Sequence, residues 1–166
     1  MPAAYLAPLT QALGATDGLA PVFAAAADAF QAEVGFRLLT VSSLEADAGA
    51  EATMVRAWSS CPAVFPVGGR KPVDNANAAW AETIMRDRRP LVCEDPAALR
   101  RFFFDHADLA SLDCGSGINL PVVLDGRVIG VVNVFHRPHW FTQERIANAQ
   151  AVLALMYPPL LLRGRT

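Results

Sequence analysis

The sequence predicts an α+β domain in which an antiparallel β-sheet is flanked by helices. Segments with the pattern of strands occur as neighbouring pairs near both ends of the chain, and such hairpins are typical of antiparallel sheets. Segments with the pattern of helices precede, separate and follow these pairs, which gives the order αββαβαββα. A parallel sheet would instead need a crossover helix between successive strands.

The composition is that of a single globular domain. The chain has 166 residues, of which 53% are hydrophobic and 18% charged, and this excludes extensive disorder. A net charge of −2 provides no basic surface for nucleic acid. No segment approaches the ~18 apolar residues of a membrane span, and the N-terminus lacks the features of a signal peptide. We therefore expect a cytoplasmic protein that binds neither nucleic acid nor membranes.

The three cysteines predict neither a disulfide framework nor a metal site. Cys61, Cys93 and Cys114 are odd in number, lie far apart and have no Cys-x-x-Cys spacing. Reduced thiols are therefore expected, and Cys93, inside a predicted strand, is expected to be buried and inert. We expect no metal and no cofactor.

Helices are predicted from apolar spacing, capping residues and terminators. Residues 19–34 are rich in alanine, with Asp17 as a possible cap and Gly35 as the terminator. Asp95 followed by proline predicts a second helix start, and Asp74 and Thr142 predict two more. The expected helices cover residues 19–34, 75–86, 96–106 and 143–158, with a shorter one near 5–13.

Strands are predicted where β-branched and apolar residues alternate or cluster. Residues 45–51 and 61–72 are expected to be loops, the second because it holds several prolines and Gly68-Gly69. In the strand 52–60, strict alternation would place Met54, Arg56 and Trp58 on one face. The expected strands cover residues 36–44, 52–60, 89–94, 117–124 and 127–136.

The last two strands flank Asp125-Gly126, a dipeptide typical of two-residue hairpin turns. Such a turn would pair Leu124 with Arg127 and, continuing in register, Ile118 with Asn133. Asn133 would then share a face with Ile118, while Asn119 would lie opposite, so at most one of these asparagines could line a pocket on a given face. Pro121 indicates an edge or a bulge.

Two motifs lie in and after this hairpin. Residues 118–134 are Ile-Asn-Leu-Pro-Val-Val-Leu-Asp-Gly-Arg-Val-Ile-Gly-Val-Val-Asn-Val, and Trp140-Phe-Thr-Gln-Glu precedes the last helix. With these motifs the chain resembles the GAF domain family over nearly its whole length. Residues 58–72 also resemble a subgroup of stand-alone bacterial GAF proteins.

The resemblance implies a GAF/PAS-like fold of about six antiparallel strands. The terminal helices would cover one face, and short helices and loops would enclose a ligand pocket on the other. A single GAF domain would span residues 18–162, after an N-terminal segment of residues 1–17. A homodimer through the N- and C-terminal helices is also implied.

The resemblance further implies a sensory or regulatory protein that binds a small molecule. Family members bind cyclic nucleotides, tetrapyrroles and amino-acid derivatives, so the ligand itself is not specified. Trp58 and Trp80 are equally explained as core residues, and His106 as a helix-end histidine near a carbonyl. The candidate ligand-binding residues are Trp58, Trp80, Phe102, His106, Cys114, Ser116 and Asn133, with Arg56 and Asp105 beside them.

The alternative is an enzyme. One GAF group, the free methionine-(R)-sulfoxide reductases, uses a catalytic cysteine before the hairpin and a resolving cysteine upstream, and Cys114 and Cys61 occupy roughly these positions. The group's carboxylates are replaced, however. Gly117 stands where those enzymes carry a glutamate, and Asn133 and Phe135 stand where they carry acids.

Overall fold

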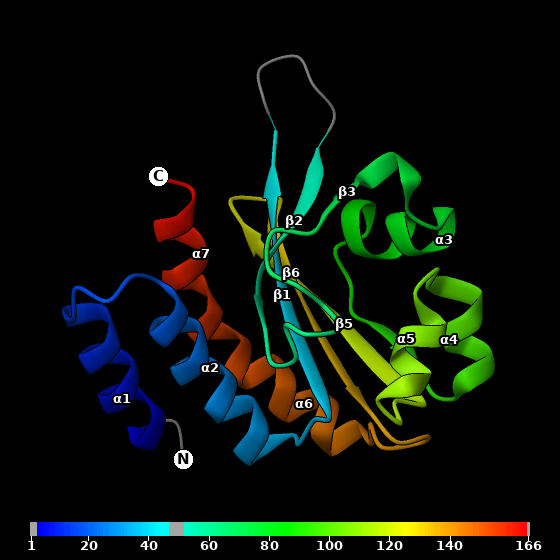
Figure 1. Cartoon of the computed structure of the whole chain (residues 1–166), viewed down its shortest axis with the longest axis horizontal. Helices are drawn as coiled ribbons and strands as arrows, with labels where there is room; N and C mark the ends of the chain where they lie inside the picture. Colours follow the sequence, from blue (N-terminus) through cyan, green and yellow to red (C-terminus); the bar gives the residue numbers. More distant parts are fainter. Residues whose placement is uncertain (1–2, 47–51, 166) are drawn as a thin grey trace.

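The computed structural model describes residues 3–46 and 52–165, and a six-stranded sheet lies at its centre (Figure 1). The strand order is β3-β2-β1-β6-β5-β4, and every neighbouring pair is antiparallel. The predicted α+β class is therefore confirmed. The strands are β1 (Leu38–Glu45), β2 (Thr53–Ser59), β3 (Arg70–Pro72), β4 (Leu91–Cys93), β5 (Ser116–Leu124) and β6 (Arg127–His136).

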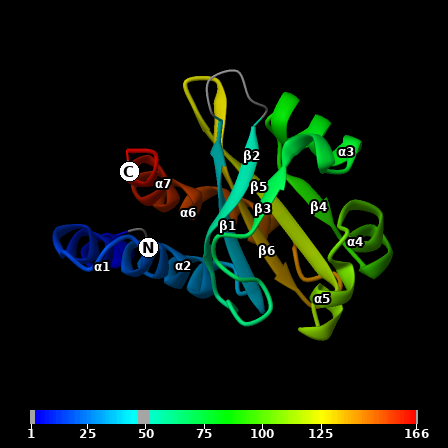
Figure 2. The ribbon, with the colours of Figure 1, turned by 45° about the horizontal axis from the view of Figure 1, so that its top comes forward.

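Helices cover both faces of this sheet, and the terminal helices lie together on one of them (Figures 1 and 2). The shorter helices of the middle of the chain cover the opposite face. No helix of the described residues is long and apolar enough to cross a membrane. The terminal-face helices are α1 (Ala3–Gly14), α2 (Ala20–Glu33), α6 (Gln143–Val152) and α7 (Tyr157–Arg163). The opposite face carries α3 (Ala78–Ala81), the π-helical turn η2 (Glu82–Arg86), α4 (Pro96–Phe102) and α5 (His106–Ser111).

The main core lies between the terminal helices and the sheet. Phe23 and Phe30 of α2 are fully buried there, against valines of β1 and β6 such as Val41 and Val132. The alanines of α2 let it lie close to the sheet, while α1 and α6 contact its flanks. Gly35 has a φ of +78° and ends α2 as predicted.

Two of the predicted helices differ from the observed ones in where they begin or break. The helix predicted from residue 75 is a 3₁₀ turn followed by α3, whose cap is Asn77 instead of Asp74. The side chain of Asn77 accepts hydrogen bonds from the backbone N–H groups of Ala79 and Trp80. The single helix predicted over residues 96–106 is two helices, because α4 ends at Phe102 and α5 begins at His106.

The C-terminal helix does not end at Pro158 as predicted. After α6 the chain makes a 3₁₀ turn, Leu153–Met156, and then continues as α7. Pro158 and Pro159 occupy the first turn of α7, where backbone N–H groups have no partner inside a helix. The prolines therefore begin a helix instead of ending one.

The predicted loops also need correction. Residues 70–72, at the end of the loop predicted over 61–72, form β3 and pair with β2. The loop predicted over residues 45–51 begins one residue too early, since Glu45 still belongs to β1. Residues 47–51 of that loop lie outside the described residues.

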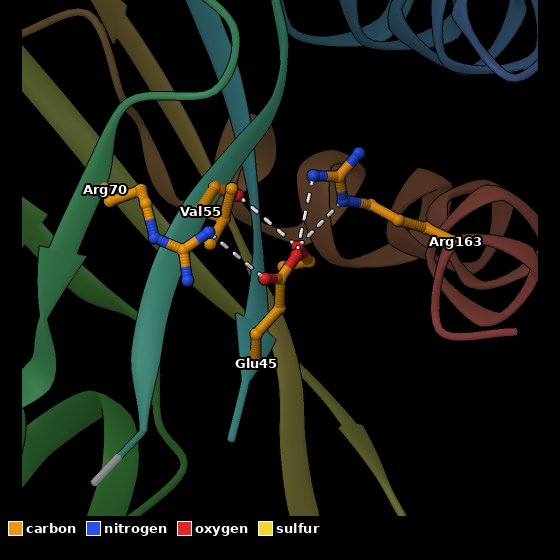
Figure 3. A network of polar contacts seen from close by, with 5 residues as sticks. Glu45, Val55, Arg70 and Arg163 are labelled. Atoms are coloured by element: carbon orange, nitrogen blue, oxygen red, sulfur yellow. Dashed lines mark hydrogen bonds and ion pairs between the residues drawn. The ribbon is translucent and has the colours of Figure 1, made fainter. Parts of the chain in front are cut away.

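The end of α7 is tied to the sheet by a polar network (Figure 3). The Glu45 carboxylate lies between two arginines, 3.5 Å from Arg70 of β3 and 3.5 Å from Arg163 of α7. The Nε–H of Arg163 also donates to Ser43 Oγ at 3.0 Å. Because Glu45 and Arg70 are exposed, the network fixes position more than it adds stability.

Leu160 of α7 packs against Gly130 of β6. A Cβ atom there would come within 2.7 Å of the backbone oxygen of Ser42 and within 2.8 Å of a Leu160 methyl group. The backbone oxygen cannot rotate away as a side chain could, so the position requires glycine.

We expect Gly130→Ala to lower the free energy of unfolding by about 1–3 kcal/mol, because the added methyl group overpacks the core. Urea unfolding followed by far-UV circular dichroism measures this. Gly14→Ala, at a helix position with nothing within 4 Å of the added Cβ, is the matched control and should change stability by less than ~0.5 kcal/mol. Equal stability of the two variants would contradict the predicted close approach.

Candidate functional site

A cavity of about 340 Å³ lies between the sheet and the short helices of the middle of the chain. The sheet contributes its floor, and the region of α3 to α5, together with the loop before β3, contributes its walls. The lining combines six aromatic residues with eight polar or charged ones, and a mixture of apolar surface and polar groups is typical of ligand pockets. The aromatic residues are Phe65, Trp80, Phe102, Phe103, Phe104 and Phe135, and the polar or charged ones are Thr40, Ser42, Arg56, Arg70, Lys71, Asn77, Asp105 and Asn133.

The register of the last hairpin differs from the predicted one and changes the floor of the cavity. Leu124 pairs with Arg127 as predicted, but a bulge at Ile129 shifts the register, so that Asn119 pairs directly with Asn133. The prediction that these asparagines face opposite ways is therefore wrong. Without the bulge, Asn133 would be buried in the apolar main core without a hydrogen-bond partner, which costs free energy.

A second bulge, in β2, separates Arg56 from Trp58. Val41 pairs with Trp58 and Ser42 pairs with Arg56, so Ala57 is the extra residue. Arg56 therefore lies with Ser42 on the cavity face. Trp58 packs against the main core on the opposite face, and the predicted common face of Met54, Arg56 and Trp58 is wrong for Trp58.

Hydrogen bonds hold the floor and one wall of the cavity together. The indole N–H of Trp80 donates to Asn119 Oδ1 at 2.7 Å, and both residues are buried. Asn133 Nδ2 donates to Thr40 Oγ1 at 3.1 Å. The Nδ2 group of Asn119 is buried without a hydrogen-bond partner among the described residues. The first bond joins α3 to the sheet and sets the position of the Trp80 ring.

Three cations and one carboxylate line the cavity, and one of the cations, Arg70, pairs with Glu45 outside the lining. Burial lowers the pKa of Arg56 and that of Lys71, while the negative charge of Asp105 opposes both changes. The positive charge of Arg56 lowers the pKa of Lys71 further. Charged groups that are partly removed from water interact more strongly with a ligand than exposed ones do.

The structure brings together three of the seven predicted ligand-binding residues, namely Trp80, Phe102 and Asn133. His106 begins α5 next to the lining residue Asp105 but does not line the cavity. Ser116 is fully buried, and its hydroxyl donates to the carbonyl of Arg137 at 2.6 Å. Trp58, His106, Cys114 and Ser116 all lie outside the cavity lining.

The lining also includes Thr40, Ser42, Phe65 and Lys71, which the sequence reasoning missed. A signal for two of them exists, because Thr40 and Ser42 are polar residues at alternate positions of a strand that begins with apolar residues. Phe65 and Lys71 lie in and after a loop, whose course cannot be derived from periodicity.

The cysteines are placed in a second apolar cluster beside the cavity. Cys93 and Cys114 are buried in it and Cys61 packs against it, all as free thiols. Burial raises the pKa of Cys114 to about 11, an effect that Arg37 opposes and Asp113 adds to. A protonated, covered thiol is a poor nucleophile, so the geometry does not favour the reductase alternative. No group of three or more metal-ligating side chains comes together in the described part of the chain.

Comparisons with known proteins agree with this arrangement. Residues 18–156 match the family model of the GAF domain. No curated protein matches the chain at a significant level. Among solved structures, the chain is similar to the GAF domain of a phosphoenolpyruvate-protein phosphotransferase from Coxiella burnetii. That match has 15% identity and a TM-score of 0.68, and it covers 97% of this chain and 94% of that chain.

Two further structures share the fold. The GAF domain of a two-component sensor histidine kinase from Bacillus halodurans is 16% identical to this chain, with a TM-score of 0.65. The match covers 86% of this chain and 95% of that chain. The chromophore-binding domain of a bacteriophytochrome from R. palustris is 15% identical to this chain, with a TM-score of 0.62. The match covers 98% of this chain and 61% of that chain.

We expect Trp80→Phe to lower the free energy of unfolding by about 1–3 kcal/mol, because it leaves the buried Asn119 side chain without its partner. Asn119→Leu should lower the free energy of unfolding by a similar amount. The loss in the double variant should be smaller than the sum of the losses in the two single variants. A double-mutant cycle by urea unfolding measures this coupling. Strict additivity would contradict the hydrogen bond.

We expect the Cys114 thiol to react slowly in the folded chain. A thiol with a pKa of about 11 is ionised to roughly one part in a thousand at pH 8, and Cys114 is only 5% exposed. Alkylation by iodoacetamide at pH 8, followed by mass spectrometry, should be about tenfold or more slower than for Cys114 in urea. Faster reaction in the folded chain would show an activated thiolate and revive the reductase alternative.

Proposed function

The chain belongs to the GAF domain family, and from this we propose that it is a sensory or regulatory protein whose small-molecule ligand binds in the cavity over Asn133. The single observation that carries the proposal is the cavity itself. It combines an aromatic wall with a few polar groups on one rigid sheet, the combination expected of a ligand site. The likeness to a chromophore-binding domain and to a sensor kinase domain supports it.

The sheet offers a route by which ligand binding would reach the rest of the molecule. Thr40 and Ser42 face the cavity, while Leu39 and Val41 of the same strand are buried on the side of the terminal helices. A ligand that moves β1 or β6 would therefore act directly on the packing of α2 and α6. In this proposal the terminal helices are the output surface.

The terminal helices also carry exposed apolar residues that support the predicted homodimer. Leu6 and Leu13 of α1 and Leu161 and Leu162 of α7 are 38–50% exposed, and a second chain would cover them. The homodimer and the cytoplasmic location both stay predictions.

We expect Ala76→Trp to block ligand binding, because Ala76 lines the cavity and an indole there would occupy part of its volume. Ala79→Trp is the matched control, since Ala79 lies three residues away on the exposed side of α3. Metabolite libraries are tested by thermal shift, and hits by isothermal titration calorimetry. Compounds that bind the wild type and the control, but bind Ala76→Trp at least about tenfold more weakly, support the proposal. Equal binding to all three chains would place the site elsewhere.

A further inference from the structure

Hydrogen-bond donors without partners occur among the buried side chains at and beside the cavity. The two buried side-chain atoms without a partner among the described residues are Arg56 Nε and Asn119 Nδ2, and both are donors. Arg56 lines the cavity and Asn119 lies against Trp80, which also lines it. A buried donor without an acceptor costs free energy, and Arg56 also brings its positive charge to the lining, so the cavity favours a ligand that carries negative charge.

Arg56 is held so that only part of its guanidinium is used by the protein. Its Nη1 donates to the carbonyl of Pro66 at 3.2 Å, and its carbon lies 5.2 Å from the ring centre of Phe65. A Cβ at Gly69 would lie only 3.0 Å from Nη1, so a larger residue there would crowd the guanidinium. Its Nε is buried without a hydrogen-bond partner among the described residues, and its Nη2 group is left to donate to the oxygen of a carboxylate.

Lys71 places a second positive charge at the same end of the cavity. Its ammonium lies 4.9 Å from the ring centre of Phe104, and the charges of Arg56 and Asp105 both act on it. Among the described residues, neither Lys71 nor Arg56 has an ion-pair partner within 4 Å. Because Arg70 of the lining pairs with Glu45, the carboxylate of Asp105 remains for two cations, which leaves one positive charge for the ligand to neutralise.

The cavity is small and also has aromatic residues in its lining. Trp80, Phe102, Phe103 and Phe135 are among them, and aromatic side chains are surfaces against which a ligand ring can pack. The volume of about 340 Å³ lies at the lower end of the ~300–1,000 Å³ typical of ligand pockets.

Resting on the proposed function, we propose that the ligand is a small aromatic carboxylate. Its carboxylate accepts hydrogen bonds from the guanidinium of Arg56 and the ammonium of Lys71, and its ring lies against Trp80 and Phe102. A neutral ring compound fills the same apolar space but leaves both cations without an anion. A cationic ring compound is repelled by the positive charges of Arg56 and Lys71.

Matched ring compounds test on the full chain whether the cavity prefers an anionic ring compound to a neutral or cationic one. We call this preference the charge rule. Phenylacetate, its neutral isostere phenylacetamide and the cation phenethylammonium are titrated calorimetrically at one ionic strength, with acetate as an anion that lacks the ring. We expect phenylacetate to bind about tenfold or more tightly than phenylacetamide, and phenethylammonium and acetate to bind more weakly still. Arg56→Gln and Lys71→Met should each reduce the preference for phenylacetate over phenylacetamide to less than about threefold.

Arg127→Gln is the control for charge, because Arg127 is exposed at the hairpin turn, outside the cavity lining; it should leave the preference unchanged. Thermal unfolding of each variant shows whether it is folded. If Arg56→Gln does not fold because it loses the hydrogen bond to Pro66, Lys71→Met alone still tests the charge rule. Equal or tighter binding of the neutral or cationic compound, blocked by Ala76→Trp, would overturn the charge rule while the proposed function stands. No binding by any of the ring compounds would count against both.

Discussion

Two β-bulges determine which side chains of the sheet meet the cavity and which enter the main core. Each inserts one residue, Ala57 in β2 and Ile129 in β6, and so reverses the facing of every residue beyond it. Asn133 thereby joins Asn119 over the cavity, and Arg56 is separated from Trp58. The facing of Asn133 in the polar floor and the position of the arginine both depend on these two insertions.

The bulges also allow the two faces of one sheet to differ in polarity. The face toward α2 and α6 must be apolar throughout, because it forms the largest core of the molecule. The other face must present polar groups to a cavity, and each of these groups needs a partner. Asn133 with Thr40, and Asn119 with Trp80, meet most of that need within the protein. In the ligand proposal, Arg56 and Lys71 make the cavity selective for negative charge.

The same layout separates the cysteines from this site. Cys93 and Cys114 are covered by Leu99, Leu109 and Phe135, and burial keeps the pKa of both thiols near 11. Family resemblance alone could place Cys114 in a catalytic position, because position in the chain is all that a motif compares. The distinction between a nucleophile and a core residue depends on desolvation, which follows from packing.

The sequence by itself determined the features that depend on near neighbours in the chain. Alternation, helical spacing and the Asp125-Gly126 turn indicated most strands and the main helices, and the motifs at residues 118–134 and 140–144 resembled those of the family. Turn and capping preferences act within a few residues, so they can be read locally. The bulges and the cavity lining were decided only by the tertiary structure. Each depends on contacts between distant segments, such as the 39 residues between Trp80 and Asn119, and no local pattern encodes such contacts.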